Sequence, residues 1–238
     1  MPSPSAKNYH LLKYADNTVL IELLHGDEPS SLQQASESLM NWWTNNNLLI
    51  DVGKTKEMIF SNWRFSPSCD DLILNDVHVD RVENFKYLGT ILDSKLNFKI
   101  NTDHVAEKAR KRIFIMKHPS FLKITESMRV KCYVAFIECC FLYHLSKIHG
   151  HLTNASKKDI NRVIKLASWL GDCSFDDIDR LSSRCMKARC LWMFTTQGNN
   201  PVFELDRLPS GCYRMLKARV ALNSNCYRVQ AIKLLNNL

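Results

Sequence analysis

The pattern of apolar residues changes near residue 100, and this change constrains the fold more than any other feature of the sequence. From about His10 to Ile100, short β-rich runs alternate with one helical stretch. From about Thr102 onward, apolar residues recur at helical spacing in one segment after another. Glycine and proline are scarce, at 7 each, which favours long elements joined by short loops. We therefore predict an α+β fold in which a small β-rich region precedes a mainly helical one.

The β-rich region begins with a predicted hairpin. Two apolar runs, His10–Tyr14 and Thr18–Leu24, flank Ala15-Asp16-Asn17, whose polar residues tolerate tight turns. The hairpin would present Asp16 at its tip. A helix follows, opened by a capping box of Ser31 and Gln34. Further strands are predicted over 48–52, 57–61 and 85–92, with a two-residue hairpin turn at Asn75-Asp76.

The second half of the chain is predicted to be helical. Its first helix is capped by Asn101, Thr102 or Asp103 and runs to His118, before Pro119. The later helices are predicted over 124–146, 156–171, 176–196 and 214–222.

Charge and hydropathy indicate the partner and the compartment. Lysine and arginine outnumber aspartate and glutamate by 32 to 24, a formal charge of +8 that suits a polyanion such as nucleic acid. The alternative is a basic protein with no such partner. The longest apolar stretch, Cys132–Leu145, is shorter than the roughly 20 residues of a membrane span. The N-terminus has no apolar signal segment. We expect a cytoplasmic or nuclear protein, not a secreted or membrane protein.

Three motifs occur in an order that resembles one polymerase family. Tyr14-Ala15-Asp16-Asn17 resembles the Tyr-Ala-Asp-Asp box of reverse transcriptases, with asparagine in place of the second aspartate. Residues 47–58, which include Lys54-Thr55-Lys56, resemble the Asn-x-Leu-x-x-Asn…Lys-Thr-Lys-x-Met segment of non-LTR retrotransposon polymerases. Phe85-Lys86-Tyr87-Leu88-Gly89 resembles their Phe-x-Tyr-Leu-Gly primer-grip strand. The similarity spans about residues 14–235.

The resemblance implies a fold and a set of site residues. Residues 8–100 would form a partial palm of hairpin, helix and small antiparallel sheet. Residues 101–171 would form a helical thumb-like region, and 172–238 a basic helical C-terminal region. Asp16 would be a ligand of catalytic Mg²⁺, and Lys54 would lie near the incoming triphosphate. The primer end would be held by Phe85, Tyr87, Leu88 and Gly89. The phosphate backbone of RNA or DNA would be bound by Lys108, Arg110, Lys111, Arg112 and Lys117.

Two departures from the family argue against catalysis. Asn17 offers a carbonyl oxygen without charge where the family has a second carboxylate. The family also needs an aspartate on an earlier palm strand, and the 13 residues before Tyr14 contain no carboxylate. Two Mg²⁺ ions require several hard oxygen ligands. We therefore predict a polymerase remnant that is inactive alone, binds no Mg²⁺ by itself and retains binding to nucleic-acid backbones.

A second resemblance leads to a different class of function. Residues 101–133 resemble the N-terminal helical segment of the AlkB-homologue family of tRNA-modifying dioxygenases. Dioxygenase chemistry needs a His-x-Asp…His iron triad on a jelly-roll barrel. The helical second half of the sequence leaves no room for such a barrel. This resemblance implies a non-catalytic helical interaction module rather than an activity.

Overall fold

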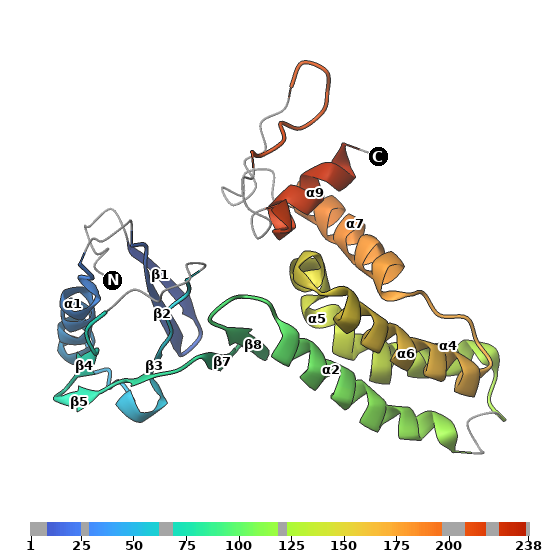
Figure 1. The fold of residues 1–238 in the computed structure, drawn as a ribbon, viewed down its shortest axis with the longest axis horizontal. Helices are drawn as coiled ribbons and strands as arrows, with labels where there is room; N and C mark the ends of the chain where they lie inside the picture. Colours follow the sequence, from blue (N-terminus) through green and yellow to red (C-terminus); the bar gives the residue numbers. More distant parts are fainter. Residues whose placement is uncertain are drawn as a thin grey trace. The chain divides into compact units, whose positions relative to one another are not determined.

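The computed structural model describes residues 9–24, 29–61, 69–118, 123–196, 208–217 and 224–236. The chain forms two compact units (Figure 1). The first contains residues 1–86 and 93–95, and the second contains residues 87–92 and 96–238. Strands dominate the first unit and helices the second, so the α+β prediction is confirmed.

A β-hairpin opens the first unit, as predicted. Strand β1 (Tyr9–Tyr14) pairs antiparallel with β2 (Asn17–Glu22), with Tyr14 opposite Asn17. Only Ala15 and Asp16 remain for the turn, and Ala15 has a left-handed φ of 53°. Two-residue hairpin turns require such positive φ values. Asn17, expected in the turn, belongs to the strand.

The hairpin is joined to helix α1 (Leu32–Asn45) through one carboxylate. Glu22 Oε1 accepts hydrogen bonds from Tyr9 Oη (3.0 Å) and Ser31 N (2.9 Å), and Oε2 accepts from Ser30 Oγ (2.6 Å). Burial alone would raise the pKa of Glu22, but these hydrogen bonds hold it below its usual value. The predicted capping box is wrong, because the Ser31 hydroxyl bonds to Glu22 instead of capping the helix.

The rest of the first unit is built from very short strands. β3 (Lys56–Glu57) pairs parallel with β6 (Asp80–Arg81), and β4 (Ile73–Leu74) pairs antiparallel with β5 (Val77–His78). The predicted Asn75-Asp76 turn is confirmed, with φ values of 49° and 58°.

The strands expected over 48–52 and 57–61 are wrong. The first stretch forms no strand and leads into a 3-10 turn, Val52–Lys54, and only Glu57 of the second lies in a strand. The described strands pair two by two, so the expected small antiparallel sheet is replaced by separate two-stranded sheets. Leu72, Leu74 and Val79 form the buried core of this unit.

The motif Phe85–Gly89 turns in the middle instead of forming one strand over 85–92. Strands β7 (Asn84–Tyr87) and β8 (Thr90–Asp93) are hydrogen-bonded neighbours joined by Leu88 and Gly89. Both linking residues have positive φ, 45° and 84°, the geometry of a two-residue hairpin turn.

The helical unit largely follows the predicted pattern. Helix α2 (Lys99–Arg112) continues as a 3-10 turn, Ile113–Lys117. It is preceded by Phe98 at φ 56°, so Asn101 and Thr102 lie inside the helix and are buried rather than capping it. The predicted helix over 124–146 is α4 (Glu126–Tyr133) and α5 (Cys139–Ile148), joined by a π-helical segment, Val134–Glu138.

The last helices are α6 (Asn154–Gly171), α7 (Ile178–Thr196) and α9 (Tyr227–Leu235). The first two agree with the predictions for 156–171 and 176–196. The helix predicted over 214–222 is wrong at 214–217, which are not helical, and 218–222 lie outside the described residues. The sequence analysis missed α9.

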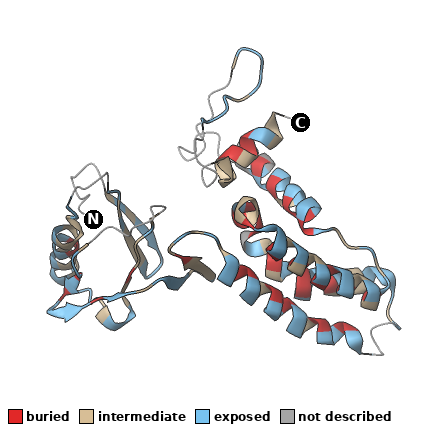
Figure 2. Ribbon diagram, viewed as in Figure 1, coloured by how far each residue is buried: buried red, intermediate tan, exposed pale blue. Residues whose placement is uncertain are grey.

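The main core lies between the helices of the second unit, where buried residues follow the inward faces of α2, α5 and α6 (Figure 2). Ala109, Tyr133, Ala167 and Leu181 are fully buried within it. The Tyr133 ring stacks on Phe175 with centroids 3.6 Å apart. Among the described helices, none is long and apolar enough to cross a membrane.

Candidate functional site

Asp16 stands exposed at the tip of the β1–β2 hairpin. Asn17 Nδ2 donates a hydrogen bond of 3.2 Å to Asp16 Oδ1, so the asparagine holds the carboxylate with its amide instead of adding a second charge. Within the described part of the chain, no group of three or more His, Cys, Asp or Glu side chains is placed to hold a metal ion. Asp16 and Asn17 therefore do not fit a two-metal centre on their own.

Lys54 lies on the 3-10 turn after Asp51. The Lys54 ammonium is 3.0 Å from Asp51 Oδ2, and Asp51 Oδ1 accepts a hydrogen bond from Lys54 N at 3.2 Å. The lysine side chain is 86% exposed, and its hydrogen bond and charge lower the pKa of Asp51. Because the pair is open to water, Lys54 can exchange Asp51 for another anion. The recorded partner of Lys54 is Asp51, not Asp16.

The turn between β7 and β8 is held by two helices of its own unit. Tyr143 Oη on α5 donates to the Leu88 carbonyl oxygen at 3.1 Å. A Cβ on Gly89 would lie 3.6 Å from the Tyr143 ring. Asn101 Oδ1 on α2 accepts from Ile91 N at 3.0 Å. The Tyr143 contacts fix the second half of the primer-grip-like motif, and the Asn101 contact fixes the strand after it. The sequence analysis did not predict either partner. Phe85 is 36% exposed and Tyr87 is half-buried.

The basic residues at the end of α2 fall into two groups. Lys108, Arg110 and Lys117 are exposed and make no ion pair among the residues that the structure describes. Lys111 pairs with Glu107 at 2.7 Å.

Arg112, in contrast, reaches into the protein. Its Nη1 donates to the Phe136 carbonyl oxygen at 3.0 Å and lies 3.3 Å from Cys140 Sγ. Phe136 belongs to the π-helical segment, where the altered hydrogen-bond ladder changes which backbone carbonyls need outside donors. Arg112 therefore stabilises the irregular turn of the long helix, a contact that no pattern in the sequence indicates.

A buried acid anchors α7 to the long helix. Glu138, in the π-helical segment, has a side chain that is 8% exposed and accepts from Arg184 Nη2 at 2.6 Å. Arg184 Nη1 also donates to Asp176 Oδ2 at 2.8 Å. Burial raises the pKa of Glu138, while Arg184 opposes that rise. The signal available in the sequence was a single charged residue inside the apolar stretch 132–145.

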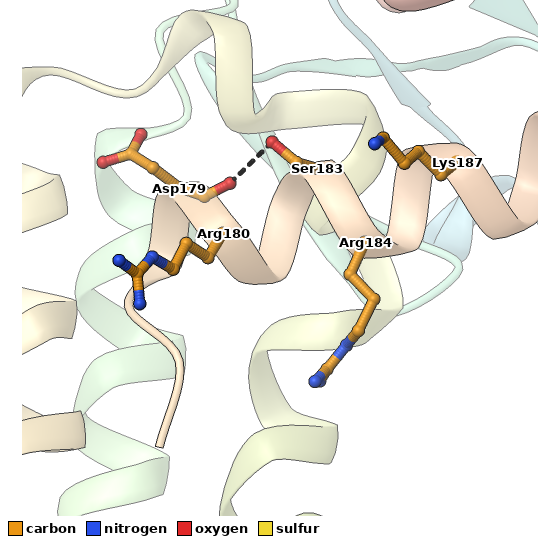
Figure 3. Close-up of a pocket in the computed structure, with 5 residues that line it drawn as sticks. All are labelled: Asp179, Arg180, Ser183, Arg184 and Lys187. Carbon is orange, nitrogen blue, oxygen red and sulfur yellow. Dashed lines mark hydrogen bonds between the residues drawn. The ribbon is translucent and has the colours of Figure 1, made fainter. Parts of the chain in front are cut away.

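Helix α7 also carries a shallow open pocket on its surface. Asp177 Oδ1 accepts from Arg180 N at 2.9 Å and so satisfies a free amide at the start of the helix. The pocket is lined by successive turns of α7, as Figure 3 shows, through Asp179, Arg180, Ser183, Arg184 and Lys187.

The comparisons with known proteins found one significant relative. The chain is 26% identical over 157 residues to "RNA-directed DNA polymerase from mobile element jockey" of Drosophila melanogaster. The match covers 63% of this chain and 16% of that protein, so the chain spans about a sixth of its relative. No family model matches, and no solved structure is significantly similar. The distant relationship supports the resemblance to non-LTR reverse transcriptases, and nothing found supports the AlkB-homologue resemblance.

Proposed function

We propose that this chain is a segment of a non-LTR retrotransposon RNA-directed DNA polymerase that binds nucleic-acid backbones and does not polymerise by itself. The observation that carries the proposal is the similarity to the jockey polymerase, together with a β-hairpin that holds Asp16 at an exposed tip. In this proposal, residues 8–100 are a partial palm, 101–171 a thumb-like region and 172–238 a basic C-terminal region.

Backbone binding is supported by charge and exposure. The chain carries a formal charge of +8, and Lys108, Arg110 and Lys117 are exposed on and after the last turns of α2. Cations of this kind contact phosphates and release counterions, which gives binding that depends on salt and not on base sequence. RNA and DNA both present such a backbone. Lys111 and Arg112 would contribute less, because each already has a partner within the protein.

The proposed primer contact is the β7–β8 turn. Its backbone is fixed by Tyr143 and Asn101, and Phe85 remains partly exposed before it. An exposed aromatic ring suits a role in holding a strand end, since bases stack on such rings. Lys54 would serve the incoming triphosphate by exchanging its partner Asp51 for phosphate.

Inactivity of the chain alone follows from its carboxylates. Nucleotidyl transfer by two metal ions requires hard anionic ligands arranged around both ions. At the hairpin tip, Asp16 supplies one carboxylate and Asn17 a neutral amide. We therefore expect no primer extension by the isolated chain with Mg²⁺ or Mn²⁺. Incorporation that exceeds that of an Asp16→Ala variant would refute this part of the proposal.

Charge-matched variants test the binding surface. Lys108→Gln/Arg110→Gln removes two exposed cations from α2. Lys158→Gln/Lys165→Gln removes two exposed cations from α6 and serves as the control. In filter binding to a primer–template, the α2 variant should show weaker affinity and a shallower salt dependence than the control. Equal losses in both variants would mean that only net charge matters, and the assigned surface would be wrong.

A further inference from the structure

The pocket on α7 is lined by charged side chains and is open to solvent (Figure 3). We propose that this face of α7, formed by Arg180, Ser183, Arg184 and Lys187, is a second binding surface for the phosphate backbone of nucleic acid. The proposal rests on the proposed function, because it extends backbone binding to the C-terminal part of the chain.

The acid that lines the pocket, Asp179, is already paired. Asp179 Oδ1 lies 2.7 Å from Lys157 Nζ and 2.8 Å from His149 Nε2, both outside α7. The hydrogen bond from Lys157, followed by that from His149, holds the pKa of Asp179 below its usual value. The carboxylate is thus ionised and paired, and it opposes an approaching phosphate less than a free aspartate would.

Arg184 is held in place by two acids, but these contacts do not occupy all of its N–H donors. It binds Glu138 and Asp176 through one recorded hydrogen bond from each terminal nitrogen, yet its side chain is 55% exposed. A guanidinium carries five N–H donors, so donors remain for a phosphate oxygen. Its charge is largely balanced by the two acids. Arg184 would therefore orient a phosphate more than attract it.

Arg180 and Lys187 supply the attraction. Neither forms an ion pair within the described ranges, and both are exposed. Their separation of seven residues places them on one side of the helix, about 10.5 Å apart along its axis. One nucleic-acid strand rises about 3.4 Å per phosphate in duplex form, so the two cations are spaced to contact phosphates about three nucleotides apart.

Ser183 lies between these cations and does not add base recognition. Its hydroxyl donates to the Asp179 carbonyl oxygen at 3.0 Å, within the helix. With that donor occupied, recognition depends on the arginine and lysine side chains. Binding at this surface should therefore be independent of base sequence and sensitive to salt.

The test compares three charge-matched double variants of the whole chain. Arg180→Gln/Lys187→Gln alters the α7 surface, and Lys108→Gln/Arg110→Gln alters α2. Lys158→Gln/Lys165→Gln is the control, with the same seven-residue spacing on α6. The probe is a short duplex DNA oligonucleotide, and the readout is the slope of log affinity against log salt. Each lost phosphate contact should reduce the slope by about 0.9, so the α7 variant should lose about 1.8.

The outcomes separate this proposal from the broader one. If the α7 variant behaves as the α6 control while the α2 variant loses affinity, the α7 surface is refuted and backbone binding stands. If the wild-type chain does not bind the oligonucleotide, both fail. If the α7 variant loses binding to anionic phospholipid vesicles but keeps the wild-type affinity for the oligonucleotide, the proposal is also overturned. The charge-preserving Arg180→Lys/Lys187→Arg variant should keep the wild-type slope, and a loss there would contradict the electrostatic reasoning.

Discussion

Neutralising Glu138 and neutralising Arg184 should change the unfolding free energy very differently, although the two residues form one ion pair. The carboxylate is 8% exposed and the arginine side chain is 55% exposed, so nearly all the desolvation cost falls on Glu138. That cost is the first cause of the raised pKa of Glu138, and the pairing with Arg184 does not cancel it. Glu138→Gln removes the buried charge and keeps the shape. We expect it to change the unfolding free energy by less than about 1 kcal/mol at neutral pH, or to raise it.

Arg184→Gln should instead destabilise the fold. It leaves the buried Glu138 carboxylate without its cationic partner, a change that costs about 3–5 kcal/mol in buried pairs. Because more than half of the arginine side chain is exposed, water can partly replace it, and we expect a loss near the lower limit, about 3 kcal/mol.

The pH dependence follows from the same raised pKa. The folded state binds the Glu138 proton more tightly than the unfolded chain, so the contribution of Glu138 to stability falls as pH rises from its unfolded to its folded pKa. The cost of Arg184→Gln should therefore shrink below the unfolded pKa, where Glu138 is protonated in both states. Urea unfolding of wild type and both variants at about pH 7 and about pH 4 measures this. Equal losses for Glu138→Gln and Arg184→Gln at neutral pH would refute the reasoning.

Two further predictions concern packing and turn geometry. Leu181 is fully buried in the main core, so Leu181→Ala should lower the unfolding free energy by about 2–5 kcal/mol in thermal or urea melts. Leu166→Ala, at a position 40% exposed, is the matched control and should cost clearly less. Gly89 has φ +84°, so Gly89→Ala should strain the β7–β8 turn by about 1–2 kcal/mol. Faster amide exchange at Ile91 would report it, and an effect no larger than that of Gly53→Ala would contradict it.

The helical half could be predicted well because it repeats one signal. Apolar residues at helical spacing placed α6 and α7 to within two residues at each end. The π-helical segment within 126–148 could not be foreseen, because it depends on Arg112 and Arg184 reaching in from other helices. Helix α9 was missed because its sequence, Tyr227–Leu235, has little polar contrast between its faces.

Strand predictions failed where short apolar runs lacked a partner. Residues 48–50 are apolar, but the Asp51 side chain that follows them favours a 3-10 turn by accepting the Lys54 amide. The apolar pattern predicts one strand over 85–92. Leucine rarely adopts positive φ, so Leu88 does not indicate the turn, and only Gly89 does. The hairpin around Asp16 was predictable because two matched apolar runs flank polar turn residues.

The sequence predicted which residues belong to the candidate site better than it predicted which residues they contact. Asp16, Lys54 and the Leu88–Gly89 turn were found through motif order, yet their recorded partners Asn17, Asp51 and Tyr143 are contacts that local sequence could suggest only in part. Tyr143 lies 55 residues from Leu88, and no periodicity links them. The assigned roles in metal, triphosphate and primer binding stay predictions.

Backbone binding by the wild-type chain is the central claim, and its salt dependence is the most direct measurement. Filter binding of an oligonucleotide across a range of salt concentrations gives the slope of log affinity against log salt. With Lys108, Arg110 and Lys117 each contributing about 0.7, we predict a slope of about −2 or steeper for a single strand. A slope near zero, or no retention at low salt, would contradict the account.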